Sequence, residues 1–188
     1  MDKDLFESFC GGINYPAPFS YGDHSYATDG RYLVRTNKIE GYEEDEKRGT
    51  DADNLLLANP NDFVAVVSMN DIEVDPATCP VCKGEAKPKE CPECFGAGVV
   101  EFDTEYNDYE VDCKTCDGGG QINSCSKCYG SGVDSSAETQ VMGIYFMSHL
   151  LHNVKKLPNC QLKIRSDKTK PSVFTFDGGD GLIMCKNK

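Results

Sequence analysis

Two twenty-residue stretches decide the organisation of this chain: CPVCKGEAKPKECPECFGAG at residues 79–98 and CKTCDGGGQINSCSKCYGSG at residues 113–132. Together they contain four Cys-x-x-Cys pairs, and glycine follows each pair. The paired cysteines are Cys79, Cys82, Cys91, Cys94, Cys113, Cys116, Cys125 and Cys128. Because two such pairs supply the four thiolates of one tetrahedral zinc site, the sequence predicts two zinc ions.

Other uses of paired cysteines are less consistent with this pattern. Iron can also occupy a four-thiolate site, and a single Cys-x-x-Cys can be a redox pair, but redox pairs usually occur singly. A closed four-cysteine site has no open coordination position, so we expect structural rather than catalytic metal. The remaining cysteines, Cys10, Cys160 and Cys185, are expected to be buried small apolar residues.

The pattern Cys-x-x-Cys-x-Gly-x-Gly, with three complete copies, resembles the cysteine-rich domain of DnaJ-type chaperones over residues 79–132. The first copy departs from it, because Lys83-Gly84-Glu85-Ala86 lacks the second glycine. Spacing alone would let neighbouring pairs share a metal. The resemblance instead implies that the first and fourth pairs share one zinc ion and that the second and third share the other. No His-Pro-Asp tripeptide is present, so no J domain is expected.

The cysteine-rich segment has turn-rich, polar borders at Asp75-Pro76 and at residues 134–136, which is typical of domain joints. We therefore predict that residues 77–133 are an insertion. Residues 1–76 together with 134–188 are expected to form one α+β domain, and about 130 residues suffice for a buried core.

Apolar periodicity predicts the elements of this domain. After the insertion, the expected elements are a strand at 139–144, a helix at 145–157, strands at 161–165 and 172–176, a turn at 177–181 and a strand at 182–186. Before it, we expect a turn at Asp29-Gly30, a strand at 31–35, a solvated acidic loop at 40–53 and a strand at 62–69. Within the insertion, residues 99–112 predict a hairpin. The predicted fold is thus a small antiparallel sheet with one main helix, plus an inserted two-zinc module that carries a β-hairpin.

The order of the predicted elements and the sequences of several segments resemble domains of a bacterial DNA sliding clamp. They are Ala27-Thr-Asp-Gly-Arg31-Tyr-Leu-Val34, Tyr145-Phe-Met-Ser-His-Leu-Leu151, Gln161-Leu-Lys-Ile164, Pro171-Ser-Val-Phe174 and Gly181-Leu-Ile-Met184. This resemblance implies a clamp-like α+β domain and suggests a replication or phage context.

The net charge of −12 is unevenly distributed. Residues 77–133 carry ten acids and five bases, so the cysteine-rich segment repels a phosphate backbone. Basic residues gather only at Lys155, Lys156, Lys163, Arg165, Lys168 and Lys170. This region is a possible nucleic-acid contact, although a solvated helix end is the simpler interpretation. With no signal peptide and no membrane-length apolar run, the sequence predicts a cytoplasmic protein without membrane contact.

No catalytic constellation stands out. The triad residue types of Asp23-His24-Ser25 are adjacent in sequence and cannot converge on one site, and His149 and His152 lack an acidic or cysteine partner nearby. We therefore expect a protein that is not an enzyme and that binds a protein partner through the zinc module and its acidic hairpin, residues 101–112. One alternative is chaperone-like binding of unfolded chains, or thiol–disulfide exchange by the cysteine pairs. The other is nucleic-acid binding through residues 155–170.

Overall fold

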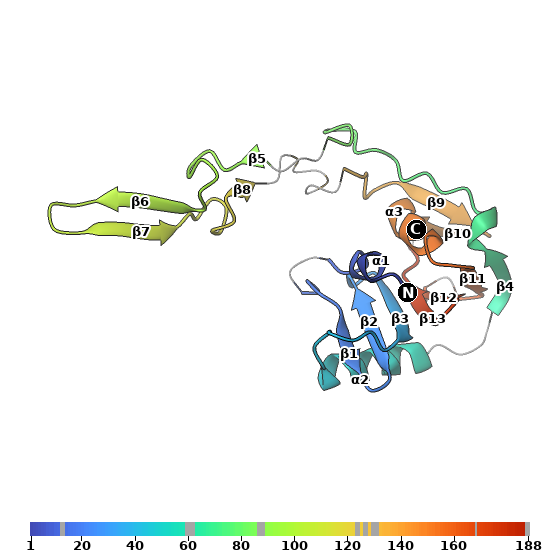
Figure 1. Ribbon diagram of the computed structural model, residues 1–188. Coiled ribbons are helices and arrows are strands. Elements are labelled where there is room, and N and C mark those ends of the chain that lie inside the picture. The colour runs from blue at the N-terminus through green and yellow to red at the C-terminus, as the bar shows by residue number, and fades with distance from the viewer. Residues whose placement is uncertain are drawn as a thin grey trace. The chain divides into compact units, whose positions relative to one another are not determined.

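The chain forms two compact units in a computed structural model, which describes residues 1–11, 14–58, 63–85, 89–122, 125, 128, 132–167 and 169–186 (Figure 1). The sheet unit comprises Met1–Asp75 and Ser136–Lys188. The cysteine unit comprises Pro76–Ser135.

The sheet unit is built on a seven-stranded sheet in the order β1-β2-β3-β13-β12-β11-β4. In chain order, its strands are β1 (Phe19–Tyr21), β2 (His24–Thr28), β3 (Tyr32–Asn37), β4 (Phe63–Ser68), β11 (Gln161–Arg165), β12 (Ser172–Phe176) and β13 (Gly179–Ile183). All neighbouring strands are antiparallel. Because β3 pairs with β13 and β4 pairs with β11, segments from both sides of the cysteine unit build one sheet.

Alternation along the strands sends apolar side chains to both faces of this sheet, because successive side chains of a strand point in opposite directions. In β3, Tyr32 and Val34 enter the larger core, whereas Leu33 enters the smaller one. The larger core includes side chains of α1 (Lys3–Glu7) and α3 (Ser148–Lys155). The smaller core includes Ala52 of α2 (Glu46–Leu57), so helices cover both faces.

Helix α2 corrects the prediction of a solvated loop at 40–53. The Asp45 side chain caps the helix by accepting a hydrogen bond from the Arg48 backbone N–H, and Glu46 occupies the first turn. Carboxylates are favourable there because they face the positive end of the helix dipole. The acidic composition therefore marks a helix start. The prediction of one main helix was wrong for the same reason.

A hairpin, β9 (Glu138–Val141) and β10 (Ile144–Met147), replaces the predicted strand at 139–144. Its turn residues Met142 and Gly143 have φ values of 49° and 81°, as a two-residue turn of the primed type requires. Primed turns are usually recognised by asparagine, aspartate or glycine at the first turn position, so Met142 does not mark this turn in the sequence. The helix accordingly begins at Ser148 rather than at 145, after Ile144 and Phe146 have been buried as strand residues.

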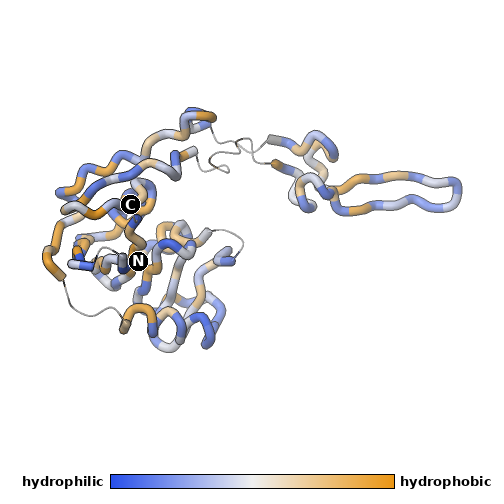
Figure 2. The backbone as a smooth tube through the Cα atoms, turned by 180° about the vertical axis from the view of Figure 1, so that it is seen from behind, coloured by the Kyte–Doolittle hydropathy of each residue, from blue (hydrophilic) through white to orange (hydrophobic). Residues whose placement is uncertain are grey.

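The strands predicted at 161–165 and 172–176 are confirmed, and the one predicted at 62–69 is present as β4. Figure 2 shows the hydrophobic colouring of β4. The predicted turn at 177–181 is wrong beyond Gly178, because β13 begins at Gly179. A Cβ on Gly181 would lie 2.2 Å from the Leu33 carbonyl oxygen and 2.3 Å from the Phe174 ring. Glycine is required here by the close neighbouring strands, and its presence in a strand misled the sequence interpretation.

We expect Gly181→Ala to destabilise the sheet unit by about 2–3 kcal/mol, because the new methyl group overlaps backbone that cannot move away. Urea unfolding followed by circular dichroism measures this. The matched control is Gly11→Ala, whose Cβ would meet nothing closer than Asp29 Cβ at 3.5 Å. Equal unfolding midpoints for the two variants would contradict the prediction.

Candidate metal centres

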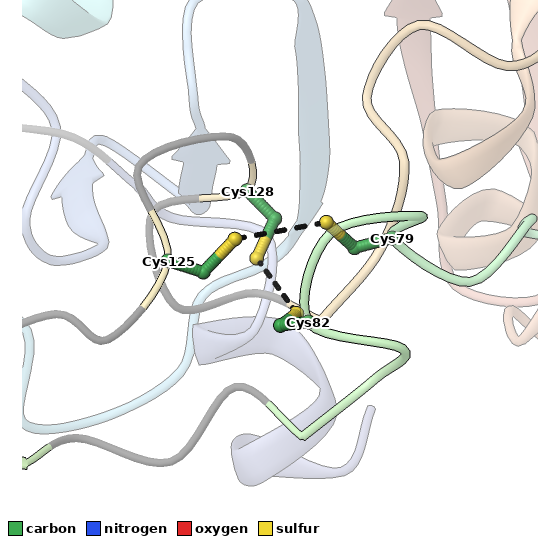
Figure 3. Close-up of side chains that lie close together, drawn as sticks. All are labelled: Cys79, Cys82, Cys125 and Cys128. Carbon is green, nitrogen blue, oxygen red and sulfur yellow. Dashed lines mark hydrogen bonds between the residues drawn. The ribbon is translucent and has the colours of Figure 1, made fainter.

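The first cluster of thiols joins the two ends of the cysteine unit. The Sγ atoms of Cys79, Cys82, Cys125 and Cys128 all lie within 4.8 Å of one another, and all four side chains point toward a common centre (Figure 3). The Sγ atoms of Cys79 and Cys125 are 3.7 Å apart, and those of Cys82 and Cys128 are 3.5 Å apart. Next to this cluster, Thr78 and Val133 form an antiparallel bridge, which brings the entry and exit of the insertion together.

The second cluster contains Cys91, Cys94, Cys113 and Cys116, again with all Sγ atoms within 4.8 Å. The short strands β5 (Lys89–Glu90) and β8 (Gln121–Ile122) pair on one side of it. On the other side begins the hairpin of β6 (Val99–Asp103) and β7 (Asp108–Asp112), which confirms the hairpin predicted at 99–112. The Cys113 backbone N–H donates to the Gly98 carbonyl at 2.8 Å, so the hairpin ladder continues directly into the cluster.

Both clusters fit a zinc ion. Zinc–sulfur bonds of about 2.3 Å in a regular tetrahedron place the sulfurs about 3.8 Å apart, whereas a disulfide brings them to about 2.05 Å. The Sγ–Sγ separations of 3.5 Å and 3.7 Å are close to the first value. Four thiols with no other ligand type also match the soft donor set of a structural zinc site.

Backbone N–H groups after the second cysteine of a pair stabilise the charge that a bound thiolate carries. The N–H groups of Gly98, Gly120 and Gly132 donate to the sulfurs of the cysteines four residues earlier, each at 3.3 Å. Such contacts hold the sulfur in place and disperse its negative charge. They give a physical role to the second glycine of the repeat.

The first glycine of the repeat lies in a left-handed turn that is the same in three of the pairs. The φ values are 51° and 84° at Lys83 and Gly84, 50° and 87° at Phe95 and Gly96, and 49° and 77° at Asp117 and Gly118. The first pair thus forms its turn even though it lacks the second glycine. Residues 86–88, 129 and 130 lie outside the described residues.

The protonation of the thiols opposes metal binding at low pH. Burial raises the pKa of Cys82 and of Cys113 to about 12, whereas the Cys94 backbone N–H lowers the pKa of Cys91 to about 7. Since only thiolates bind zinc, Cys82 and Cys113 must each lose a proton as the metal enters. Acidification therefore favours the protonated, metal-free form.

The clusters join the first pair with the fourth and the second with the third, which is the arrangement that the DnaJ resemblance implies. Cys10, Cys160 and Cys185 belong to the sheet unit and pack in or against its larger core. Burial raises the pKa of Cys160 to about 12, so this thiol stays protonated. His149 and His152 belong to neither cluster.

The basic residues at 155–170 have partners of their own. Lys155 donates to the Ile72 carbonyl, Lys156 to Asn153, Lys170 pairs with Asp167, and the Lys163 ammonium lies over the Phe63 ring. Arg165 is only 1% exposed, so the prediction that it contacts phosphate is wrong. Lys168 lies outside the described residues.

Sequence reasoning missed a cavity of about 230 Å³ between α2 and the sheet. Apolar side chains that include Leu33, Leu55 and Leu182 line it, together with Arg31 and Arg48. Residues from several distant segments meet there, so no local motif marks it. The one available signal was the run of three leucines at residues 55–57, after a mostly charged and polar segment.

We expect the purified protein to contain two zinc ions per chain, measured by atomic emission. After denaturation without chelator, three thiols should react with a thiol reagent, and all eleven should react once a chelator removes the metal. Disulfides, iron or a single metal ion would contradict this prediction.

We expect Gly120→Ala to empty the second cluster alone and lower the zinc content from two ions to one. A Cβ on Gly120 would lie 2.3 Å from the Gly96 carbonyl oxygen, and its φ of 70° disfavours alanine. The control is Gly119→Ala, whose Cβ would come no closer than 3.2 Å to the Cys116 carbonyl oxygen. Two zinc ions in both variants would show that the close approach of the two turns is unnecessary.

Comparison with known proteins identifies no family. No protein-family model matches the chain, and no curated protein matches its sequence. Among solved structures, the chain is similar to the DNA polymerase III beta subunit of Thermotoga maritima, with 15% identity and a TM-score of 0.29. The alignment covers 88% of this chain and 42% of that one, so the chain spans less than half of its length. A TM-score this low supports no inference about function.

No helix in the described part of the chain is long and apolar enough to span a membrane.

Proposed function

We propose that this chain is a zinc-binding adaptor, not an enzyme, and that its cysteine unit contacts a protein partner. The observation that carries the proposal is the composition of the β6–β7 hairpin. Phe102, Tyr109 and Val111 are 48%, 45% and 47% exposed, although they are large apolar side chains on neighbouring strands. Apolar side chains grouped on an exposed strand pair are typical of a contact surface.

The metal sites supply the stability that this surface needs. An isolated two-stranded hairpin is only marginally stable in water. Here β6 begins and β7 ends next to the second cluster, with Gly98 following the Cys94 turn and Cys113 following β7. Zinc in that cluster would fix the base of the hairpin and contribute folding free energy rather than chemistry.

The sheet unit offers a second contact surface. The cavity beside α2 is smaller than the roughly 300 Å³ typical of the smallest drug-sized ligand sites. It therefore suits one or two apolar side chains of a bound peptide better than a cofactor. Leu55 and Met184, at its edge, are both exposed.

The replication or phage context rests on sequence resemblance alone. The Ala27–Val34 segment and the segments between Tyr145 and Met184 resemble sliding-clamp domains. They support a clamp-like sheet unit that acts with replication proteins as the finer form of the proposal.

The two alternatives have less support. Thiol–disulfide exchange requires reactive thiolates, and zinc in both clusters would block all eight paired thiols. Nucleic-acid binding through residues 155–170 could not use Arg165, because that side chain is buried. The described lysines of this region already have partners within the protein.

The proposal is tested by capturing partners from an extract of the organism that encodes the chain, with the zinc-loaded protein as bait. We expect the double variant Phe102→Ser, Tyr109→Ser to lose a partner that the intact protein retains. The matched control is Leu57→Ser, Val64→Ser, which changes two exposed apolar residues of the sheet unit. Unchanged retention by the hairpin variant, with two zinc ions still bound, would reject the hairpin as the contact surface.

A further inference from the structure

The β6–β7 hairpin has two chemically different faces. Register pairs Val100 with Val111 and Phe102 with Tyr109, so these four side chains share one face. The rings of Phe102 and Tyr109 stack with their centroids 5.2 Å apart. The other face carries the pairs Glu101 with Glu110 and Asp103 with Asp108. One face is thus apolar and the other is a ladder of carboxylates.

The carboxylate face is not neutralised. Residues 99–112 contain six acids and no lysine, arginine or histidine. Within the described part of the chain, no cation pairs with Glu101, Asp103, Asp108 or Glu110. Like charges directly opposite each other destabilise a strand pair, so positive charge on this face would stabilise the hairpin.

The outer edge of β7 is open to a further strand. Among the described residues β7 pairs only with β6, and all five of its residues are exposed. Native edge strands are commonly protected by charged side chains, especially lysine, by proline or by a bulge, and the charges of β7 are all carboxylates, which leave its edge open to a basic strand. Residues 108–112 contain no lysine or proline, and the register of the pair has no shift.

The hydrogen-bond pattern shows which backbone groups face outward. The Cys113 N–H donates to the Gly98 carbonyl, and the Thr104 N–H donates to the Asn107 carbonyl. In an antiparallel pair, hydrogen-bonded and non-hydrogen-bonded residue pairs alternate. Glu110, opposite Glu101, therefore belongs to a non-hydrogen-bonded pair, and its N–H and C=O point away from β6.

We propose that β7 accepts a third strand from a partner protein, an extended segment in which apolar and basic residues alternate. This inference deepens the adaptor function and rests on it. Alternation follows from the pleat, because the side chains of an added strand point in turn to each face. Apolar residues would extend the Phe102–Tyr109 face, and lysine or arginine would lie beside the carboxylates. A third strand also supplies what a two-stranded sheet lacks for stability.

The first test uses the full-length, zinc-loaded protein and fluorescent nine-residue peptides in anisotropy titrations. One peptide alternates lysine with valine and phenylalanine, a second has the same composition in separate blocks, and a third replaces lysine with glutamate. We expect the alternating basic peptide to bind at least about tenfold more tightly than the other two, and to bind more weakly as salt increases. Equal binding of the block peptide would overturn the proposal, because charge alone would then explain it.

The second test separates charge from strand pairing. Glu110→Gln removes one carboxylate, whereas Glu110→Pro also removes an N–H that the hairpin does not use. We expect Glu110→Gln to weaken the alternating peptide several-fold and Glu110→Pro to weaken it by about tenfold more. Both variants should retain two zinc ions. The control Glu43→Gln, at an exposed position of the sheet unit, should bind as the unchanged protein does.

The outcomes distinguish this proposal from the adaptor function. If Glu110→Pro binds like Glu110→Gln, or if the alternating peptide does not bind, the third strand is overturned. The adaptor function still stands if Phe102→Ser, Tyr109→Ser loses a captured partner. If that variant retains every partner, both proposals fail.

Discussion

Sulfur atoms take the place of a hydrophobic core in the cysteine unit. Among the described residues, its two buried clusters consist mainly of cysteines, with Val100 and Ile122 packed against the second one. Four protonated thiols attract one another weakly, so a cation that binds all four would stabilise the compact arrangement. The turns, the glycines and the hairpin all follow from this requirement, because each places a sulfur, a sulfur-binding N–H or a strand end around the same point.

The sequence was most informative where chemistry rather than packing sets the spacing. Four Cys-x-x-Cys pairs predicted two groups of four thiols, and the structure contains two such groups. Strands β11 and β12 were predictable because their alternation is regular. Helix α2 was missed because its cap, Asp45, stands among other acids that resemble a solvated loop.

Tertiary contacts explain the remaining differences. Gly179 and Gly181 resemble turn residues in isolation, and only the neighbouring backbone and the Phe174 and Phe176 rings explain why a strand needs them. The β9–β10 turn depends on a methionine with positive φ, which no local rule predicts. The cavity beside α2 depends on contacts between distant segments, so it is visible only once the chain is folded.

The bridge between Thr78 and Val133 has a consequence for how the sheet unit assembles. Strands β3 and β4 must find β13 and β11, which the chain reaches only after the whole cysteine unit. While that unit is unfolded, the search spans a long flexible loop. Metal bound in the first cluster would hold entry and exit together and so shorten this loop. Shortening the loop between β4 and β11 from roughly 90 residues to roughly 40 would lower the free-energy cost of loop closure by about 0.8 kcal/mol. Metal bound in the inserted unit would thereby ease the assembly of a sheet whose strands lie on either side of that unit in the sequence.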